Sequence, residues 1–330
     1  MIFLGNRIFQ CGKKILKGDA GTLLCGIINA TPDSFSDGGR YMGTEKALKR
    51  AGELIAGGAR MLDIGGESTR PGSTPVSPEE EAARVVPVIK AIREAYPDIL
   101  ISVDTFKAHT AKAAIDAGCD IINDITGLMG DPLMADVIAD SDAGLILMFN
   151  PVIIRPDHPG SRIFPDFYGN KDFRREDLDR IQNLPVTRMM QAYFDMAIHY
   201  AEAHGIAKER IMLDPGIGFG LTKNENFTLI RDMEVLKAFG LLTFLGVSRK
   251  RFIVNLLGEN GIETDLSKDD GLRNVDAGSA CLSAIAAKSG VSVLRVHDAA
   301  RHRAATEIGN AVRLAENMVD KNFGSYKEKK

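Results

Sequence analysis

The chain has 330 residues, of which 45% are hydrophobic and 26% are charged, and this is the balance of a folded protein with a large core rather than of a disordered one. A net charge of −3 provides no basic field, so we expect no nucleic-acid partner. Barrels of alternating strands and helices reach about 250 residues or more, so length alone allows one domain or two.

Short apolar runs recur along the chain, and each is followed by a longer amphipathic segment. This alternation is typical of βα units around a parallel sheet. Eight strands are predicted, at residues 23–29, 61–64, 101–104, 121–124, 145–148, 211–214, 244–247 and 293–296. Helices are predicted between and after them, at residues 45–56, 78–95, 107–117, 186–204, 224–239, 274–288 and 299–318.

Eight such units predict an α/β fold of the (β/α)8 TIM-barrel type. A doubly wound open sheet usually has a G-x-G-x-x-G turn after its first strand, whereas this chain has NATPDSFSDGG there. Two segments, 150–185 and 258–270, interrupt the alternation, but neither has enough apolar periodicity for a core of its own. Residues 1–330 are therefore predicted to form a single domain, with a rim insertion at 151–185 after strand five and a flexible tail at 322–330.

Four cysteines, Cys11, Cys25, Cys119 and Cys281, lie far apart without a C-x-x-C pair, which favours free thiols over a disulfide framework. No apolar run reaches the roughly 18 residues of a membrane span, and the N-terminus lacks the continuous apolar stretch of a signal peptide. We therefore expect a cytoplasmic protein without a membrane partner.

Polar residues occur where nearly every predicted strand ends and its loop begins, which is the face that carries catalytic groups in such barrels. Any one of them could be only a turn or helix cap. Together they combine cations with carboxylates, which indicates a site for a molecule with an anionic end and a donor-rich end. These residues are Asn29, residues 67–70, Asp104, Asn123, Asp124, Asp214, residues 248–251, Arg295 and His297.

Seven motifs that contain these polar residues resemble those of the dihydropteroate synthase family, and they occur in the family's order. They are GIINATPDSFSDGG (26–39), LDIGGESTRPG (62–72), SVDT (102–105), INDI (122–125), LDPGIGFG (213–220), GVSRKRFI (246–253) and LRVHD (294–298). The resemblance extends from about residue 9 to residue 319, except for the segment after strand five. It implies an enzyme of folate biosynthesis, a sulfonamide target, that joins a dihydropterin methyl diphosphate to p-aminobenzoate. It also implies that pyrophosphate leaves first, that Mg²⁺ is the cofactor and that the protein is a homodimer.

The resemblance also assigns roles to individual residues. Asp104, Lys250 and Arg295 would be catalytic, and Asn29 would help to hold Mg²⁺. The pterin and its diphosphate would be bound by Asp104, Asn123, Ile125, Asp214, Lys250, Arg295 and His297. Two loops would close over the site and complete the p-aminobenzoate pocket, with residues Phe35, Asp37, Ser68, Thr69, Arg70 and Pro71 from the loops and Phe219, Lys250 and Arg251 from the barrel.

Three departures from the family pattern leave two alternatives open. Phe149 and Asn150 stand where the family has a His-Met pair, which predicts an altered wall of the pterin pocket. Leu221 stands where the family has lysine, and the insertion is longer than the usual connection. A non-catalytic pterin-binding paralogue would fit these changes. A methyltetrahydrofolate-dependent methyltransferase would share the barrel, but it would not need the STRPG and SRKR motifs.

Overall fold

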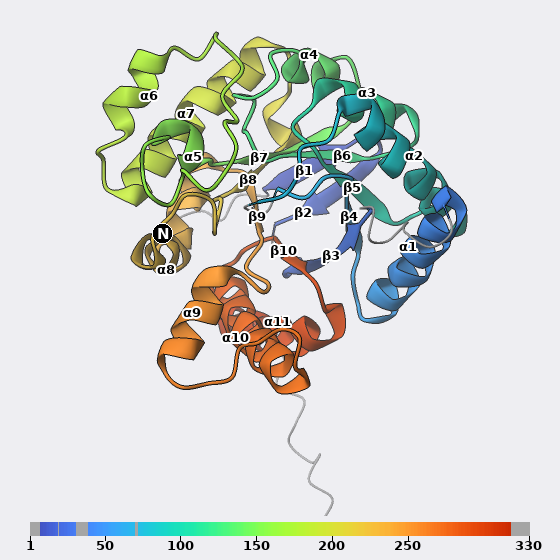
Figure 1. The fold of residues 1–330 in the computed structure, drawn as a ribbon, viewed down its shortest axis with the longest axis vertical. Helices are drawn as coiled ribbons and strands as arrows, with labels where there is room; N and C mark the ends of the chain where they lie inside the picture. The colour runs from blue at the N-terminus through green and yellow to red at the C-terminus, as the bar shows by residue number, and fades with distance from the viewer. Residues whose placement is uncertain (1–6, 19, 31–38, 70–71, 318–330) are drawn as a thin grey trace, which may run out of the picture.

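The computed structural model describes residues 7–18, 20–30, 39–69 and 72–317, and its centre is a closed barrel of eight parallel strands (Figure 1). The strands are ordered β10-β3-β4-β5-β6-β7-β8-β9, so the last strand of the chain pairs with the first strand of the barrel. The predicted (β/α)8 TIM barrel is thereby confirmed. The strands are β3 (Leu23–Asn29), β4 (Met61–Gly65), β5 (Leu100–Asp104), β6 (Ile121–Asp124), β7 (Gly144–Met148), β8 (Ile211–Asp214), β9 (Leu242–Leu245) and β10 (Val293–Val296).

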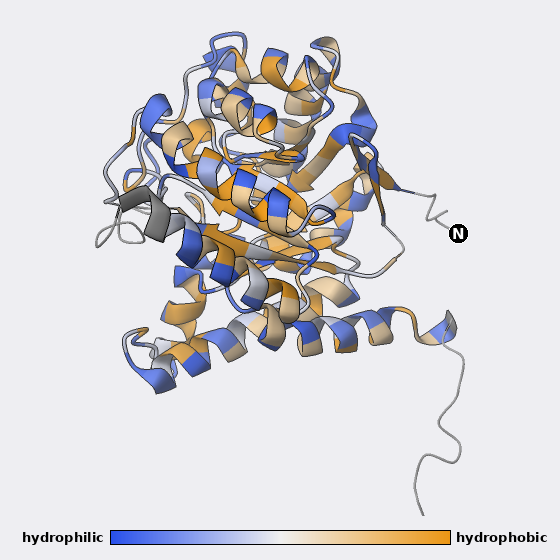
Figure 2. Ribbon diagram, turned by 90° about the vertical axis from the view of Figure 1, so that its right-hand side faces the viewer, coloured by the Kyte–Doolittle hydropathy of each residue, from blue (hydrophilic) through white to orange (hydrophobic). Residues whose placement is uncertain are grey.

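Helices surround the barrel, and Figure 2 shows both hydrophilic and hydrophobic residues along them, whereas the central strands are mainly hydrophobic. This pattern is expected where a helix has one face on a core and the other in water. The α-helices are α1 (Gly39–Ala56), α2 (Pro78–Ala95), α3 (Ala108–Asp116), α4 (Met134–Ala139), α5 (Pro151–Ile154), α6 (Arg175–Ile181), α7 (Val186–Ala203), α8 (Lys223–Arg231), α9 (Arg251–Glu259), α10 (Asp269–Lys288) and α11 (Ala299–Arg313). No helix in the described part of the chain is long and apolar enough to cross a membrane.

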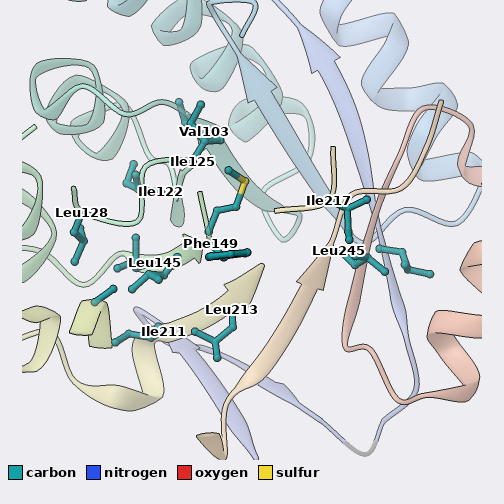
Figure 3. Packing of buried hydrophobic residues seen from close by; sticks show 14 of the residues in the cluster. Val103, Ile122, Ile125, Leu128, Leu145, Phe149, Ile211, Leu213, Ile217 and Leu245 are labelled. Carbon is teal, nitrogen blue, oxygen red and sulfur yellow. The ribbon is translucent and has the colours of Figure 1, made fainter. Parts of the chain in front are cut away.

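Two apolar layers stabilise the barrel. The larger one fills the space between strands and helices, and Figure 3 shows Ile122, Leu145 and Leu213 among its buried residues. The smaller one fills the interior at the amino ends of the strands, where Cys25, Met61 and their counterparts on the other strands meet.

An N-terminal hairpin covers the inner layer at the amino ends of the strands. This hairpin was not predicted from the sequence. Strands β1 (Ile8–Cys11) and β2 (Lys14–Lys17) pair antiparallel. Phe9 is fully buried, and its ring lies so close to Gly144 that a Cβ there would be 2.3 Å from the ring. The amino end of the barrel is therefore packed solid, and the open end is the opposite one.

Several predicted boundaries were wrong. The strand predicted at 244–247 lies two residues earlier, because the apolar run around it is continuous and gives no sign of where pairing starts. The helix predicted at 224–239 is divided at Asp232 into α8 and a 3₁₀ helix, η3 (Met233–Phe239). Two further 3₁₀ helices are η2 (Lys208–Arg210) and η4 (Ala315–Asn317). The predicted tail at 322–330 lies outside the described residues.

The insertion after β7 contains α5 and α6, and it adds to the outer apolar layer. Phe167, Phe173 and Leu178 of this segment are buried. Aromatic side chains separated by polar and glycine residues thus pack here without a helical period, so their contribution to the core could not be predicted from the sequence.

Candidate active site

The open end of the barrel is polar because side chains alternate along each strand. Residues two apart point to the same side of a strand. Met61, Ile121 and Met212 belong to the inner apolar layer, and two residues further along the same strands come Asp63, Asn123 and Asp214. The barrel interior therefore changes from apolar to polar between one inward-facing residue of a strand and the next.

A buried ion network crosses this polar layer. Arg295 Nε donates to Asp63 Oδ2 at 2.5 Å, and an Arg295 terminal nitrogen donates to Asp104 Oδ2 at 2.9 Å. Burial opposes the charge of Arg295, but the carboxylates of Asp63 and Asp104 raise the pKa of its guanidinium above the usual value. The guanidinium is thus held in place from two sides at the floor of the site.

Asp63 is a central residue of the site that the sequence analysis missed. Its side chain is fully buried, and it also accepts hydrogen bonds from Ser102 Oγ at 2.5 Å and from Asn123 Nδ2 at 3.3 Å. The strand sequence MLDIG indicates an inward aspartate only once Met61 is known to face inward, because residues two apart point to the same side of a strand.

Asn123 has an unsatisfied acceptor at the same level. Its Oδ1 is buried and has no hydrogen-bond partner among the described residues. An unpaired buried acceptor costs free energy, so a ligand donor that reaches it is favoured. This is the behaviour expected of a group that recognises an N–H of a heterocycle.

Two carboxyl groups of the layer have strongly shifted acidities. Burial raises the pKa of Asp104 to about 7, even though Arg295 acts to lower it. Burial also raises the pKa of Asp214 to about 6, against a hydrogen bond from the Gly216 N–H and the charge of Lys250. Both groups therefore favour partners that donate hydrogen bonds or carry positive charge.

Lys250 is positioned by the turn after β9. It is the residue before α9, and Arg249 before it has a left-handed backbone with φ of 55°. Arg249 is fixed in that conformation by a two-atom contact with buried Asp276 and by an N–H bond to Ser279 Oγ. The Lys250 ammonium lies 4.7 Å from the centre of the Phe219 ring.

His297 and Asn29 both lie at the opening of the barrel. The imidazole Nδ1 of His297 is 3.0 Å from Ser248 Oγ, which also accepts from the His297 backbone N–H at 3.2 Å. Both Asn29 and His297 line the main cavity and a smaller neighbouring one. No group of three or more His, Cys, Asp or Glu that could hold a metal occurs in residues 7–18, 20–30, 39–69 and 72–317.

The structure brings most of the predicted site residues together around one cavity of about 790 Å³. Phe35, Asp37, Arg70 and Pro71 lie outside the described residues. The cavity is lined by Asn29, Ser68, Thr69, Asp104, Asn123, Ile125, Asp214, Phe219, Lys250, Arg251, Arg295 and His297.

The three substituted positions of the family pattern, Phe149, Asn150 and Leu221, lie outside this cavity. Phe149 packs against Tyr193 of α7 with ring centres 5.3 Å apart, so the expectation that it alters the pterin pocket was wrong. Met148 lines the cavity instead, because successive residues point to opposite sides of the strand. Asn150 is buried and caps α5, and Leu221 packs against the outer apolar layer.

Comparisons with known proteins agree with this geometry. The family model described as pterin binding enzyme matches residues 25–297. The dihydropteroate synthase of Streptococcus pyogenes serotype M6 is 39% identical over 292 residues, which cover 88% of this chain and 94% of the relative.

Two solved structures of the Xanthomonas albilineans dihydropteroate synthase are also similar. The one with 4-aminobenzoic acid has a TM-score of 0.76 at 34% identity, and the one with 7,8-dihydropteroate has a TM-score of 0.71 at 29% identity. Each comparison covers 93% of this chain and 98% of the solved chain. The match over most of both chains, together with the polar barrel mouth, shows that this chain belongs to the dihydropteroate synthase family of pterin-binding enzymes.

Proposed function

We propose that this chain condenses (7,8-dihydropterin-6-yl)methyl diphosphate with p-aminobenzoate, giving 7,8-dihydropteroate and pyrophosphate. The observation that carries the proposal is the buried Asn123 acceptor, which has no partner among the described residues, in a cavity that is also lined by the carboxyl groups of Asp104 and Asp214 and by the cations Lys250 and Arg295. A pterin ring bears several N–H donors, and its diphosphate is the anionic end that Arg295 and His297 can meet.

The polar floor suits the bond-breaking step. The C–O bond between the pterin methylene carbon and the diphosphate breaks, and its electron pair leaves with the diphosphate. Arg295 and His297 would stabilise the leaving charge, while Asp104 would stabilise positive charge that develops on the pterin. The amine nitrogen of p-aminobenzoate then forms the C–N bond and loses a proton.

We also propose that Mg²⁺ accompanies the diphosphate and that Asn29 supplies its protein ligand. A hard ion that keeps waters and phosphate oxygens needs few protein ligands, which fits a wall with an amide oxygen and no acidic or histidine cluster among the described residues. When bound, the ion would neutralise charge on the leaving group. A homodimer is a further proposal, supported by exposed Ile285 on α10 and by Ile308 and Val312 on α11.

The test is pyrophosphate release by purified protein given the pterin diphosphate, with and without p-aminobenzoate, and with Mg²⁺ or a chelator. We expect release that depends on both p-aminobenzoate and Mg²⁺, and dihydropteroate as the product. Asp104→Asn and Lys250→Ala should each lower the rate at least about 100-fold, because each removes a charge that faces the reacting groups. The exposed pair Lys112 and Asp116 on α3 provides matched controls, Lys112→Ala and Asp116→Asn, that should keep the full rate.

Two outcomes would contradict the proposal. Pterin binding without turnover would favour the non-catalytic paralogue. Methyl transfer from methyltetrahydrofolate, without any pyrophosphate release, would favour the methyltransferase.

A further inference from the structure

We propose that Phe164, on the insertion between β7 and α7, is a specificity-determining residue for the arylamine substrate. The inference rests on the proposed function and deepens it, because it gives the 151–185 insertion a role at the site. Phe164 and Phe219 would together form the apolar wall against which the p-aminobenzoate ring lies.

Phe164 lines the same cavity as the polar groups of the barrel mouth. Its ring is stacked on Phe219, with ring centres 5.6 Å apart and an angle of 26° between the planes. Phe219 in turn lies 4.7 Å from the Lys250 ammonium. The aromatic pair thus extends from the cationic rim of the site onto the insertion, and among the described residues Phe164 is the one residue of the insertion that lines the cavity.

The insertion is braced against the loop after β8 on one side of Phe164. Arg155 donates to both carboxylate oxygens of Glu225, at 2.7 and 3.1 Å, and to the Gly220 carbonyl at 3.2 Å. Gly160 lies directly against the Gly220 backbone, since a Cβ there would be 3.3 Å from the Gly220 carbonyl. These contacts fix the position of the insertion relative to Phe219.

A second brace holds the segment on the other side. The Phe167 ring is buried and meets Phe106 edge-on, with ring centres 5.5 Å apart. The backbone N–H groups of Gly169 and Asn170 both donate to the Met129 carbonyl, at 3.1 and 3.0 Å. Phe164 is therefore held over the cavity by contacts on both sides, from the β8 loop and from the loops after β5 and β6.

The chemistry of the two substrates decides which one this wall serves. A pterin needs hydrogen-bond partners around its ring, and those lie deep in the barrel at Asn123 and Asp214. The ring of p-aminobenzoate has no polar atoms of its own, and its carboxylate requires a cation nearby. Two stacked phenyl rings next to Lys250 match that combination.

The experiment compares steady-state kinetics of the full-length wild type with Phe164→Ala and Phe164→Tyr. Loss of one aromatic contact should raise the KM for p-aminobenzoate roughly 2- to 12-fold in Phe164→Ala. The kcat and the KM for the pterin diphosphate should stay within twofold of the wild type. Phe164→Tyr should keep the wild-type KM, because its ring can still stack. Ile163→Ala is the matched control, since Ile163 is the exposed neighbour on the same segment.

The possible failures can be told apart. An unchanged KM for p-aminobenzoate in Phe164→Ala, with a wild type that turns over, overturns this inference alone. A parallel rise in both KM values with a lower Tm also overturns it, because Phe164 would then only support the fold. A wild type that makes no dihydropteroate overturns the proposed function, and this inference falls with it.

Discussion

The buried carboxylate of Asp63 organises the polar groups of the barrel mouth. It is fully buried, and it contacts Arg295, Asn123 and Ser102 at once. A charge in such a place is tolerated only when it is paired and hydrogen-bonded, and each of its contacts also orients the partner. We therefore infer that Asp63 is a positioning residue, which orients Arg295 and Asn123.

We expect Asp63→Asn to lower kcat/KM for the pterin diphosphate by about 10- to 100-fold, because a small displacement of Arg295 and Asn123 disturbs the reacting geometry. The KM for p-aminobenzoate should change little. Ser102→Ala is the milder comparison, since it removes one hydrogen bond to Asp63 and leaves the ion pair intact. Circular dichroism and thermal unfolding would establish that both variants fold. Wild-type kcat/KM in folded Asp63→Asn would contradict the positioning role.

Polar residues of the site that end a strand could be predicted from the sequence, but those inside a strand could not. Residues such as Asp104 and Asp214 end their strands, so position alone indicated them. Asp63 lies inside a strand, and finding it required the inward register of Met61, which only the closed barrel establishes. Phe149 was misplaced for the same reason, because the side of the strand to which it points depends on that register.

The N-terminal hairpin shows how an element far from the site can stabilise the barrel. Phe9 enters the inner apolar layer, and its ring fits only because Gly144 has no side chain. A fully buried aromatic ring stabilises the folded state because its apolar surface is removed from water and because it fills space that would otherwise be a cavity. The hairpin thus closes one end of the barrel while the site occupies the other.

Phe9→Ala should lower the free energy of unfolding by about 3–5 kcal/mol, which is the usual effect of removing a buried phenyl ring. Both KM values should stay unchanged, because the layer of Asp63 and Asn123 lies above the cavity that forms. Urea denaturation followed by fluorescence or circular dichroism would measure the loss. Ile15→Ala, at an exposed position of the same hairpin, should be nearly neutral. A loss below about 1 kcal/mol in Phe9→Ala would show that the hairpin is dispensable.

Elements could be predicted from the sequence where hydrophobic periodicity was long or the apolar run was isolated. All eight barrel strands were found, and α2 was predicted with its correct bounds. The hairpin was missed because its strands, IFQC and KILK, are interrupted by polar residues and form no continuous apolar run. The division of the helix predicted at 224–239 was missed because the amphipathic pattern continues across Asp232.

The free energy of unfolding of the whole molecule should depend on the pH-sensitive groups of the site. The pKa of Asp104 is about 7 in the folded protein, against an ordinary value of 3.8. The folded state therefore binds its proton more tightly than the unfolded chain does. The contribution of this group to stability is fully present below pH 3.8 and is lost as the pH rises through about 7.

Asp104→Asn should therefore become more stable relative to the wild type as the pH is raised from about 5 to about 8, because asparagine cannot ionise. The Tm difference between variant and wild type, measured by calorimetry across this range, is the quantity to follow. The comparison with the wild type is needed because buried His302, with its pKa lowered to about 4, changes stability in the opposite direction. Asp116→Asn should run parallel to the wild type, and parallel curves for Asp104→Asn would contradict the expectation.

Closure of the barrel between β10 and β3 also bears on how the protein is made. Arg295 and Asp63 are 232 residues apart in the chain, so neither the ion pair nor the closing strand pairing can form until β10 has been translated. At ribosomal speeds of about 5–20 residues per second, the open edges of the unfinished sheet persist on the order of 10 to 50 seconds. During that interval the nascent protein exposes apolar strand edges that a chaperone would have to shield from neighbouring chains.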